Sequence, residues 1–199
     1  MVTRYSVLLI LLSIFVILLN KKVQKKNLLL IYMITIVILG FVVLIYFWKG
    51  NYQITFCTPL IALRYTILIT LFYLLEKLVV NIIINKTIIL DVKYYITGKL
   101  NIVKFLFSIP IMTIEELAFR LPIIFDNASH LSCWSYLIIS SFTFGSVHIF
   151  FSKQDLVSKT ILGFILGFTM IETQNIIFSI VLHLFYNFLA CRPYQMRGK

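Results

Sequence analysis

The stretch Ile111–Pro122, with the sequence IMTIEELAFRLP, places two adjacent glutamates, Glu115 and Glu116, inside a long apolar run. The whole chain has only 7 acidic residues, so this pair stands out. A charge at the centre of a bilayer costs at least about 2.5–3.5 kcal/mol, and such residues are therefore kept for pairing or for chemistry. The two glutamates are the first candidates for a functional site.

The composition around this stretch is that of a membrane protein. Of 199 residues, 61% are hydrophobic and 13% are charged, whereas soluble domains have roughly 45–50% apolar and roughly 25% charged residues. Apolar stretches of about 18 residues recur along the chain, which predicts an all-α, polytopic transmembrane helical bundle without a soluble domain. We expect seven spans, at residues 3–20, 28–48, 59–84, 101–125, 133–151, 156–172 and 175–191.

The net charge of +11 comes from lysines and arginines that lie mostly between these spans. They gather on alternate connections, so the positive-inside rule places the N-terminus outside and the C-terminus in the cytoplasm. Charges placed in this way do not predict a nucleic-acid partner. Arg64, Glu76 and Lys77 lie near the two ends of the third span, and we expect them to reach the membrane interface without a role in chemistry.

Helical spacing relates the polar residues of the fourth and seventh spans. Glu116 and Arg120 are four residues apart and can form an ion pair on one helix face. Glu115 then points about 100° away, onto a neighbouring face. His183 and Asn187 have the same spacing and also share a face. These spacings predict one paired acid, one available acid and a polar face on another helix.

These residue types suit the activation of water. A carboxylate beside a histidine, such as His148 in the fifth span, can act as a general base. A second histidine with an amide on the same face can donate hydrogen bonds to a developing oxyanion.

Three motifs on apolar segments resemble the signature of the CAAX prenyl protease and bacteriocin-processing family (CPBP, or Abi), whose members are intramembrane glutamic proteases: Glu115-Glu116-x-x-x-Arg120, Phe144-x-x-x-His148 and His183-x-x-x-Asn187. The resemblance covers roughly residues 100–190. Bacterial members often have a glycine directly after the motif arginine, whereas Leu121 and Pro122 follow it here. This departure concerns the local bend of the helix and not a catalytic group.

The resemblance implies an intramembrane endopeptidase that hydrolyses a peptide bond. Its implied catalytic residues are Glu115 and His148, which would activate the water, and His183 and Asn187, which would form the oxyanion site. Glu116, Arg120 and Phe144 would support the pocket. The chain would then divide into N-terminal helices with an interfacial segment (1–100), a CPBP-like catalytic core of four spans (101–191) and a cytoplasmic tail (192–199).

Two alternatives remain open at this stage. The protein could confer self-immunity to a bacteriocin without catalysis. It could also be a metal-dependent variant of the protease, because two glutamates and two histidines can ligate Zn²⁺. The chain lacks the His-Glu-x-x-His motif of many zinc proteases, and we therefore expect no cofactor. The expected partners are a membrane-associated peptide or protein substrate and the lipid bilayer, in a multi-pass protein of a bacterial cell membrane.

Overall fold

Every element in the described part of the chain is a helix, as the apolar runs predict. The computed structural model describes residues 2–20, 57–86, 98–124 and 130–192, with residue 95 and single positions between 30 and 41. The helices are α1 (Val2–Asn20), α3 (Pro59–Val80), the π-helix η1 (Asn81–Asn85), α5 (Ile102–Ile124), α6 (His130–Val147), the 3₁₀ turn η2 (His148–Phe150), α7 (Lys153–Thr173) and α8 (Ile176–Ala190).

Local capping explains where the last two long helices begin. Before α7, the Ser152 side chain accepts a hydrogen bond from the Asp155 N–H, and the Ser152 hydroxyl donates to the Asp155 carboxylate at 2.6 Å. The Ser152 side chain therefore pairs with a backbone N–H of the first turn, which has no partner within the helix. As a result α7 begins at Lys153, three residues before the predicted start at residue 156. Asn175 caps α8 in the same way by accepting from the Phe178 N–H at 2.9 Å. Gln174, at φ 50°, separates the two helices.

The predicted ranges that fall on described residues correspond to helices, with a local difference in the fifth range in addition to the early start of α7. The predicted fifth span, residues 133–151, corresponds to α6 followed by η2, so the helix tightens into a 3₁₀ turn at His148. The predicted second span at 28–48 and most of the interfacial segment lie outside the described residues.

Within the described residues, three helical segments are long and apolar enough to cross a membrane: Pro59–Ile83, Cys133–Phe150 and Lys153–Thr173. The helix α8 is apolar but has 15 residues, or roughly 22 Å at 1.5 Å per residue. The helix α5 is longer, at 23 residues, but contains both glutamates and Arg120. Two of the helices that carry the candidate site thus have atypical features for a simple span.

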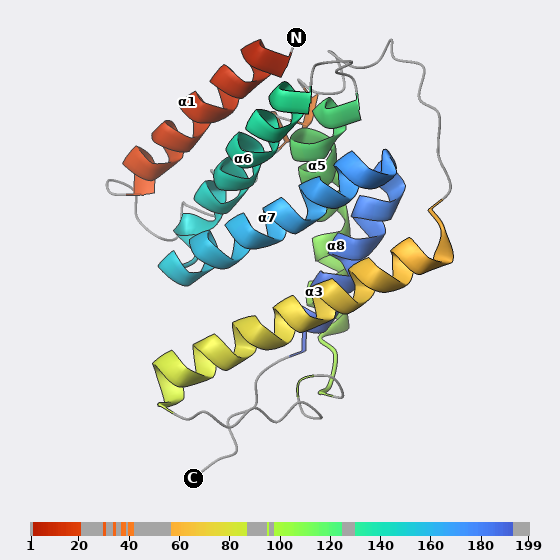
Figure 1. Cartoon of the computed structure of the whole chain (residues 1–199). Helices are drawn as coiled ribbons and strands as arrows, with labels where there is room; N and C mark the ends of the chain where they lie inside the picture. The colour runs from red at the N-terminus through yellow and green to blue at the C-terminus, as the bar shows by residue number, and fades with distance from the viewer. Residues whose placement is uncertain are drawn as a thin grey trace.

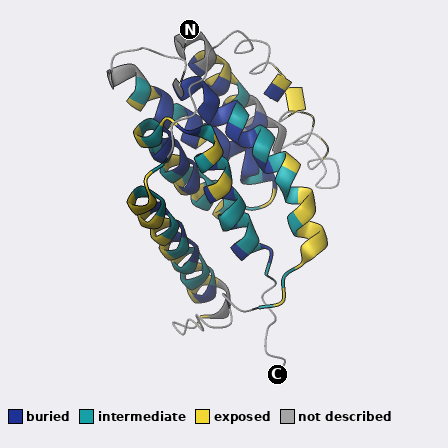
Figure 2. Cartoon of the chain, turned by 90° about the vertical axis from the view of Figure 1, so that its right-hand side faces the viewer, coloured by how far each residue is buried: buried dark blue, intermediate teal, exposed yellow. Residues whose placement is uncertain are grey.

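The candidate catalytic helices form the centre of the bundle. The helix α5 contacts α6, α7 and α8, while α1 packs on α6 and α3 lies against α7 and α8 (Figure 1). Ser13 on α1 donates a hydrogen bond to Thr143 on α6 at 2.9 Å. Buried residues are concentrated in the middle of the bundle (Figure 2). Apolar side chains such as Leu63 and Leu71 are exposed. Exposed leucines of this kind suit a surface that faces lipid.

Two small residues let α6 and α7 pack closely. A Cβ atom at Gly145 on α6 would lie 2.5 Å from the Leu156 carbonyl oxygen of α7. On α7, a Cβ atom at Gly167 would lie 2.4 Å from Leu137. Gly163 and Gly167 form a Gly-x-x-x-Gly pattern, which favours close helix contact in membranes. This packing brings the α7 backbone up to the residues described next.

Candidate active site

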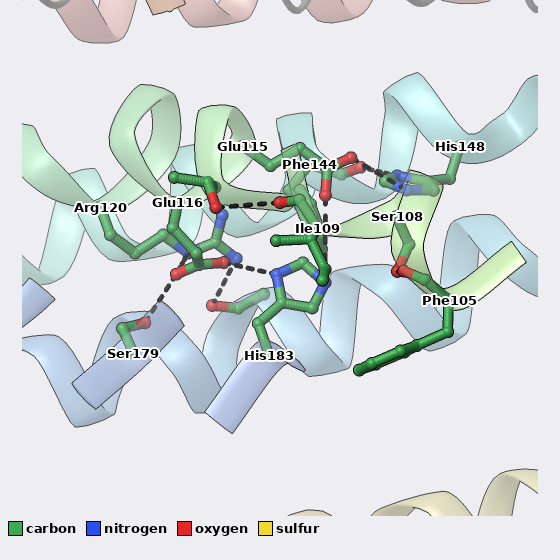
Figure 3. Close-up of polar contacts among 12 residues, drawn as sticks. Phe105, Ser108, Ile109, Glu115, Glu116, Arg120, Phe144, His148, Ser179 and His183 are labelled. Atoms are coloured by element: carbon green, nitrogen blue, oxygen red, sulfur yellow. Dashed lines mark hydrogen bonds and ion pairs between the residues drawn. The ribbon is translucent and has the colours of Figure 1, made fainter. Parts of the chain in front are cut away.

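Glu116 lies at the centre of a fully buried polar cluster. Its side chain is inaccessible to solvent, and Arg120 Nε lies 3.6 Å from its Oε2 atom. From α8, the Ser179 hydroxyl donates to the same oxygen at 2.6 Å, and His183 Nδ1 lies 2.8 Å from Oε1 (Figure 3). Three groups from two helices therefore hold this carboxylate in place.

Arg120 is buried on the other side of this ion pair. Its guanidinium carbon lies 4.4 Å from the ring centroid of Phe144 and 5.6 Å from that of Phe119. Its Nη2 atom donates to the Gly163 carbonyl of α7 at 3.4 Å. A Cβ atom at Gly163 would lie 3.2 Å from the same Nη2 atom. The guanidinium is thus held mainly by one carboxylate and by aromatic faces, which attract cations.

Phe144 connects the arginine to both histidines. Its ring centroid lies 4.8 Å from that of His148 and 5.8 Å from that of His183, and both contacts are edge-on. The Phe144 side chain is completely buried. It therefore packs against the site, and its position fits the supporting role expected from the motif.

Glu115 points in a different direction and faces two imidazoles. Its Oε1 atom lies 3.5 Å from His148 Nε2, and its Oε2 atom lies 3.9 Å from His183 Nε2 (Figure 3). Both distances are longer than the donor–acceptor distance of a normal N–H···O hydrogen bond, which is about 2.7–3.2 Å. The structure thus brings together three of the four predicted catalytic residues, with space between their polar atoms.

A backbone contact determines how His148 presents its ring. His148 Nδ1 lies 2.7 Å from the Phe144 carbonyl oxygen. A carbonyl oxygen can only accept a hydrogen bond, so we assign the proton to Nδ1. Neutral His148 then has an unprotonated Nε2 atom, and this acceptor faces the Glu115 carboxylate, which is also an acceptor.

His183 is oriented by Glu116 in the same manner. Because the carboxylate accepts, His183 donates from Nδ1, and its Nε2 atom is directed towards Glu115. The sequence predicted a shared face for His183 and Asn187 but not this contact, which places one imidazole between the two glutamates.

The remaining predicted residue, Asn187, lies in a cavity of about 410 Å³ that Glu115, His148 and His183 also line. The cavity is at one end of the bundle, where α3 and α8 end and α5 and α7 begin. The other lining residues are Glu76, Lys77, Lys104, Ser108, Ile111, Met112, Phe151, Asp155, Lys159, Tyr186, Ala190 and Cys191.

Glu76 makes contacts that the sequence did not predict. It lines the cavity and accepts a hydrogen bond from the Tyr186 hydroxyl of α8. Arg64 likewise pairs with Glu172 of α7, which also accepts from Tyr65. Spacing within α3 could not reveal these contacts, because they depend on which helix packs beside it.

Sequence reasoning also missed two residues that signals in the sequence could have found. Ser179, which holds Glu116, is four residues before His183 and therefore shares its helix face. Gly163, whose carbonyl accepts from Arg120, begins the Gly-x-x-x-Gly pattern of α7.

The described residues contain no group of three or more His, Cys, Asp or Glu side chains arranged to hold a metal ion. Two acids and two histidines are close together, but Glu116 is engaged with Arg120 and Ser179.

Comparison with known families gives one match. Residues 97–189 match the family described as type II CAAX prenyl endopeptidase Rce1-like. The match spans α5 to α8 and confirms the family resemblance seen in the three motifs. Over this range the chain is similar to that family, and the described residues include three helices long and apolar enough to cross a membrane. No curated protein and no solved structure matches the chain.

Proposed function

We propose that this protein is an intramembrane endopeptidase of the CAAX protease type that hydrolyses a peptide bond of a membrane-associated peptide or protein. The observation that carries the proposal is the pair of facing acceptors, Glu115 Oε1 and His148 Nε2, at 3.5 Å. Two acceptors do not bond to each other. A water molecule has two hydrogens to donate, and it would satisfy both atoms at the edge of the cavity.

Such a water would be a prepared nucleophile. With both hydrogens directed at Glu115 and His148, its lone pairs face away from them and towards the cavity. As the water oxygen bonds to the scissile carbonyl carbon, one water proton passes to this pair, which acts as the general base. The same proton then passes to the leaving amine as the C–N bond breaks. The products are a carboxylic acid and an amine, and the base is regenerated.

The tetrahedral intermediate requires hydrogen-bond donors for its oxyanion. Asn187 lines the cavity one helical turn after His183, and its amide N–H groups suit this role. His183 can donate from Nε2 only when it is doubly protonated, because Nδ1 already donates to Glu116. We therefore assign the oxyanion primarily to Asn187, with His183 as the second member of the site.

Glu116, Arg120 and Phe144 support the site in this proposal. The ion pair fixes one charge in the core, so that the Glu116 carboxylate can orient His183 without taking part in the reaction. Phe144 separates Arg120 from the two imidazoles and packs against all three.

The proposed setting is a bacterial cell membrane crossed seven times, with the N-terminus outside. The cavity is lined by Lys77, Lys104 and Lys159, which belong to the helix ends predicted to be cytoplasmic. A substrate would then be cleaved near the inner face of the membrane. Processing of a bacteriocin or another small peptide is compatible with this placement.

Purified protein reconstituted in liposomes and incubated with a degenerate library of acylated peptides tests the proposal, with products identified by mass spectrometry. Cleavage should disappear in Glu115→Gln and persist in the presence of a chelator. Loss of cleavage in the chelator would favour the metal-dependent variant. If no peptide is cleaved and protection of cells against a bacteriocin survives both Glu115→Gln and His148→Ala, the protein acts in immunity without catalysis.

A further inference from the structure

Lys159 is a cation inside the candidate active-site cavity for which the proposed reaction has no role. It lies in the second turn of α7 and is only partly accessible to solvent. Its Nζ atom lies 4.2 Å from the ring centroid of Tyr186, and its side chain lines the same cavity as Glu115, His148 and Asn187. The aromatic ring therefore holds the ammonium group close to the proposed reaction site.

The carboxylates nearest to this lysine are all engaged with other groups. Asp155, one turn earlier on α7, accepts from the Ser152 hydroxyl. Glu76 accepts from the Tyr186 hydroxyl and lies 3.8 Å from Lys77. Glu115 faces the two imidazoles. Among the described residues, no carboxylate oxygen is within 4.0 Å of Lys159 Nζ.

The two arginines that contact α7 or its side chains are paired. Arg120 has Glu116 at 3.6 Å, and Arg64 has Glu172. An ammonium group within a membrane-embedded bundle is costly unless an anion accompanies it. Lys104 also lines the cavity without a carboxylate oxygen within 4.0 Å among the described residues, but it is exposed to solvent, whereas Lys159 is half-buried. The counter-ion of Lys159 therefore belongs in the cavity.

We propose that Lys159 binds a carboxylate of the substrate, so that the cavity selects peptides with an anionic group close to the scissile bond. This inference rests on the proposed proteolysis, because it assigns a specificity residue to the same site. A cavity of about 410 Å³ holds a short segment, and an extended chain advances about 3.3 Å per residue. The carboxylate therefore lies within a few residues of the bond that is cleaved.

A peptide can supply this carboxylate in two ways, from its C-terminus or from an acidic side chain. The probes are acylated octapeptides made in four forms: with a free or an amidated C-terminus, and with a single Glu or Gln in the second half. Binding is measured by calorimetry in detergent with the Glu115→Gln protein, which keeps peptides intact. Cleavage is measured separately with the Glu115-containing protein.

Either amidation of the C-terminus or replacement of Glu by Gln in the peptide should weaken binding by about tenfold or more. This is the effect expected when one partner of a desolvated charge pair is removed. Lys159→Met should weaken binding of the acid form by the same factor and leave the neutral form unchanged. Lys159→Arg, which keeps the charge, should restore part of the preference. In the cleavage assay, Lys159→Met should raise KM far more than it lowers kcat.

Lys153→Met is the matched control, because it removes the same charge from the same helix without touching this cavity. It should change binding by no more than about twofold, as is usual for an exposed charge. An unchanged preference for the acid form in Lys159→Met would overturn the inference. Binding that depends on anionic lipid and not on the carboxylate of the peptide would also overturn it, because Lys159 would then contact a lipid phosphate. Acid-dependent binding without any cleavage would overturn the proposed proteolysis but leave the carboxylate site standing.

Discussion

The two adjacent glutamates of α5 occupy opposite kinds of environment. Glu116 is fully buried and is held by Arg120, Ser179 and His183 at distances of 3.6 Å or less. Glu115 lines the cavity and meets His148 and His183 only at 3.5 and 3.9 Å. A carboxylate enclosed by donors in the core is fixed in place, whereas one that faces a cavity can bind water and exchange protons.

The contrast teaches how one helix turn can combine stability with reactivity. The side chains of consecutive helical residues point about 100° apart, so one acid enters the core while the next enters the cavity. His183 joins the two regions, because its Nδ1 atom faces Glu116 and its Nε2 atom faces Glu115. Glu116 thereby orients the His183 ring, which also faces Glu115.

The largest expected effect separates the two acids by activity. Glu115→Gln keeps the size of the side chain but removes the base, and should lower kcat by about 10²–10⁴. Its midpoint of thermal unfolding in detergent should change little, because glutamine keeps the shape of the side chain and the Glu115 carboxylate lies 3.5 and 3.9 Å from the two imidazoles (Figure 3). A variant that retains near-normal kcat in the liposome assay would end the assignment of Glu115 as the base.

The second prediction separates the acids by stability. Glu116→Ala leaves Arg120 as an unpaired buried charge and should lower the free energy of unfolding by about 3–5 kcal/mol. Replacing both members, in Glu116→Ala with Arg120→Met, should recover part of this loss, since the charge is removed as well. Reversible unfolding in mixed micelles measures both values. Equal losses in the single and double variants would show that the pair does not act as a unit.

The third prediction, of a smaller effect, concerns Asn187 in the cavity that Glu115 also lines. Asn187→Ala should lower kcat by about 10²–10³ if the amide donates to the oxyanion. KM and the unfolding midpoint should change little, because the donor acts mainly in the transition state. Steady-state kinetics on the best library peptide measures the two constants. A rise in KM with unchanged kcat would instead indicate that Asn187 binds the ground state of the substrate.

The smallest expected effect concerns the buried hydrogen bond between Ser179 and Glu116. Ser179→Ala removes the hydroxyl that donates to Glu116 at 2.6 Å, and should cost about 1–3 kcal/mol of unfolding free energy. Ser158→Ala is the matched control, because the Ser158 hydroxyl has no hydrogen-bond partner among the described residues. Its effect should be within about 0.5 kcal/mol. Comparable losses in the two variants would mean that the Ser179 hydrogen bond adds nothing specific.

Several features could be predicted from the sequence because they depend on one helix at a time. Apolar runs predicted the described helices, and the four-residue spacing of Glu116 and Arg120 predicted a contact that is present at 3.6 Å. The capping serine before α7 shows the limit of this approach. The apolar pattern began at residue 156, whereas the Ser152 cap starts the helix at Lys153.

Other features could not be predicted in this way, because they depend on how helices are rotated against each other. Nothing in the spacing of α3 shows that Glu76 turns inward to Tyr186, and nothing in α8 alone shows that His183 meets Glu116. The partner of a side chain is decided by the neighbouring helix, and here by close approaches such as that at Gly163.

The sequence by itself determined that two acids, two histidines and an amide lie in apolar helices, and which of them share a helix face, because the 3.6-residue period fixes angles within a helix. The tertiary structure decided that Ser179 and His183 of α8 hold Glu116 and that Glu115 faces His148 at 3.5 Å. It also decided that Lys159 enters the same cavity without a counter-ion among the described residues. The reason is that packing sets the depth and rotation of each helix relative to its neighbours, and only these fix which atoms meet.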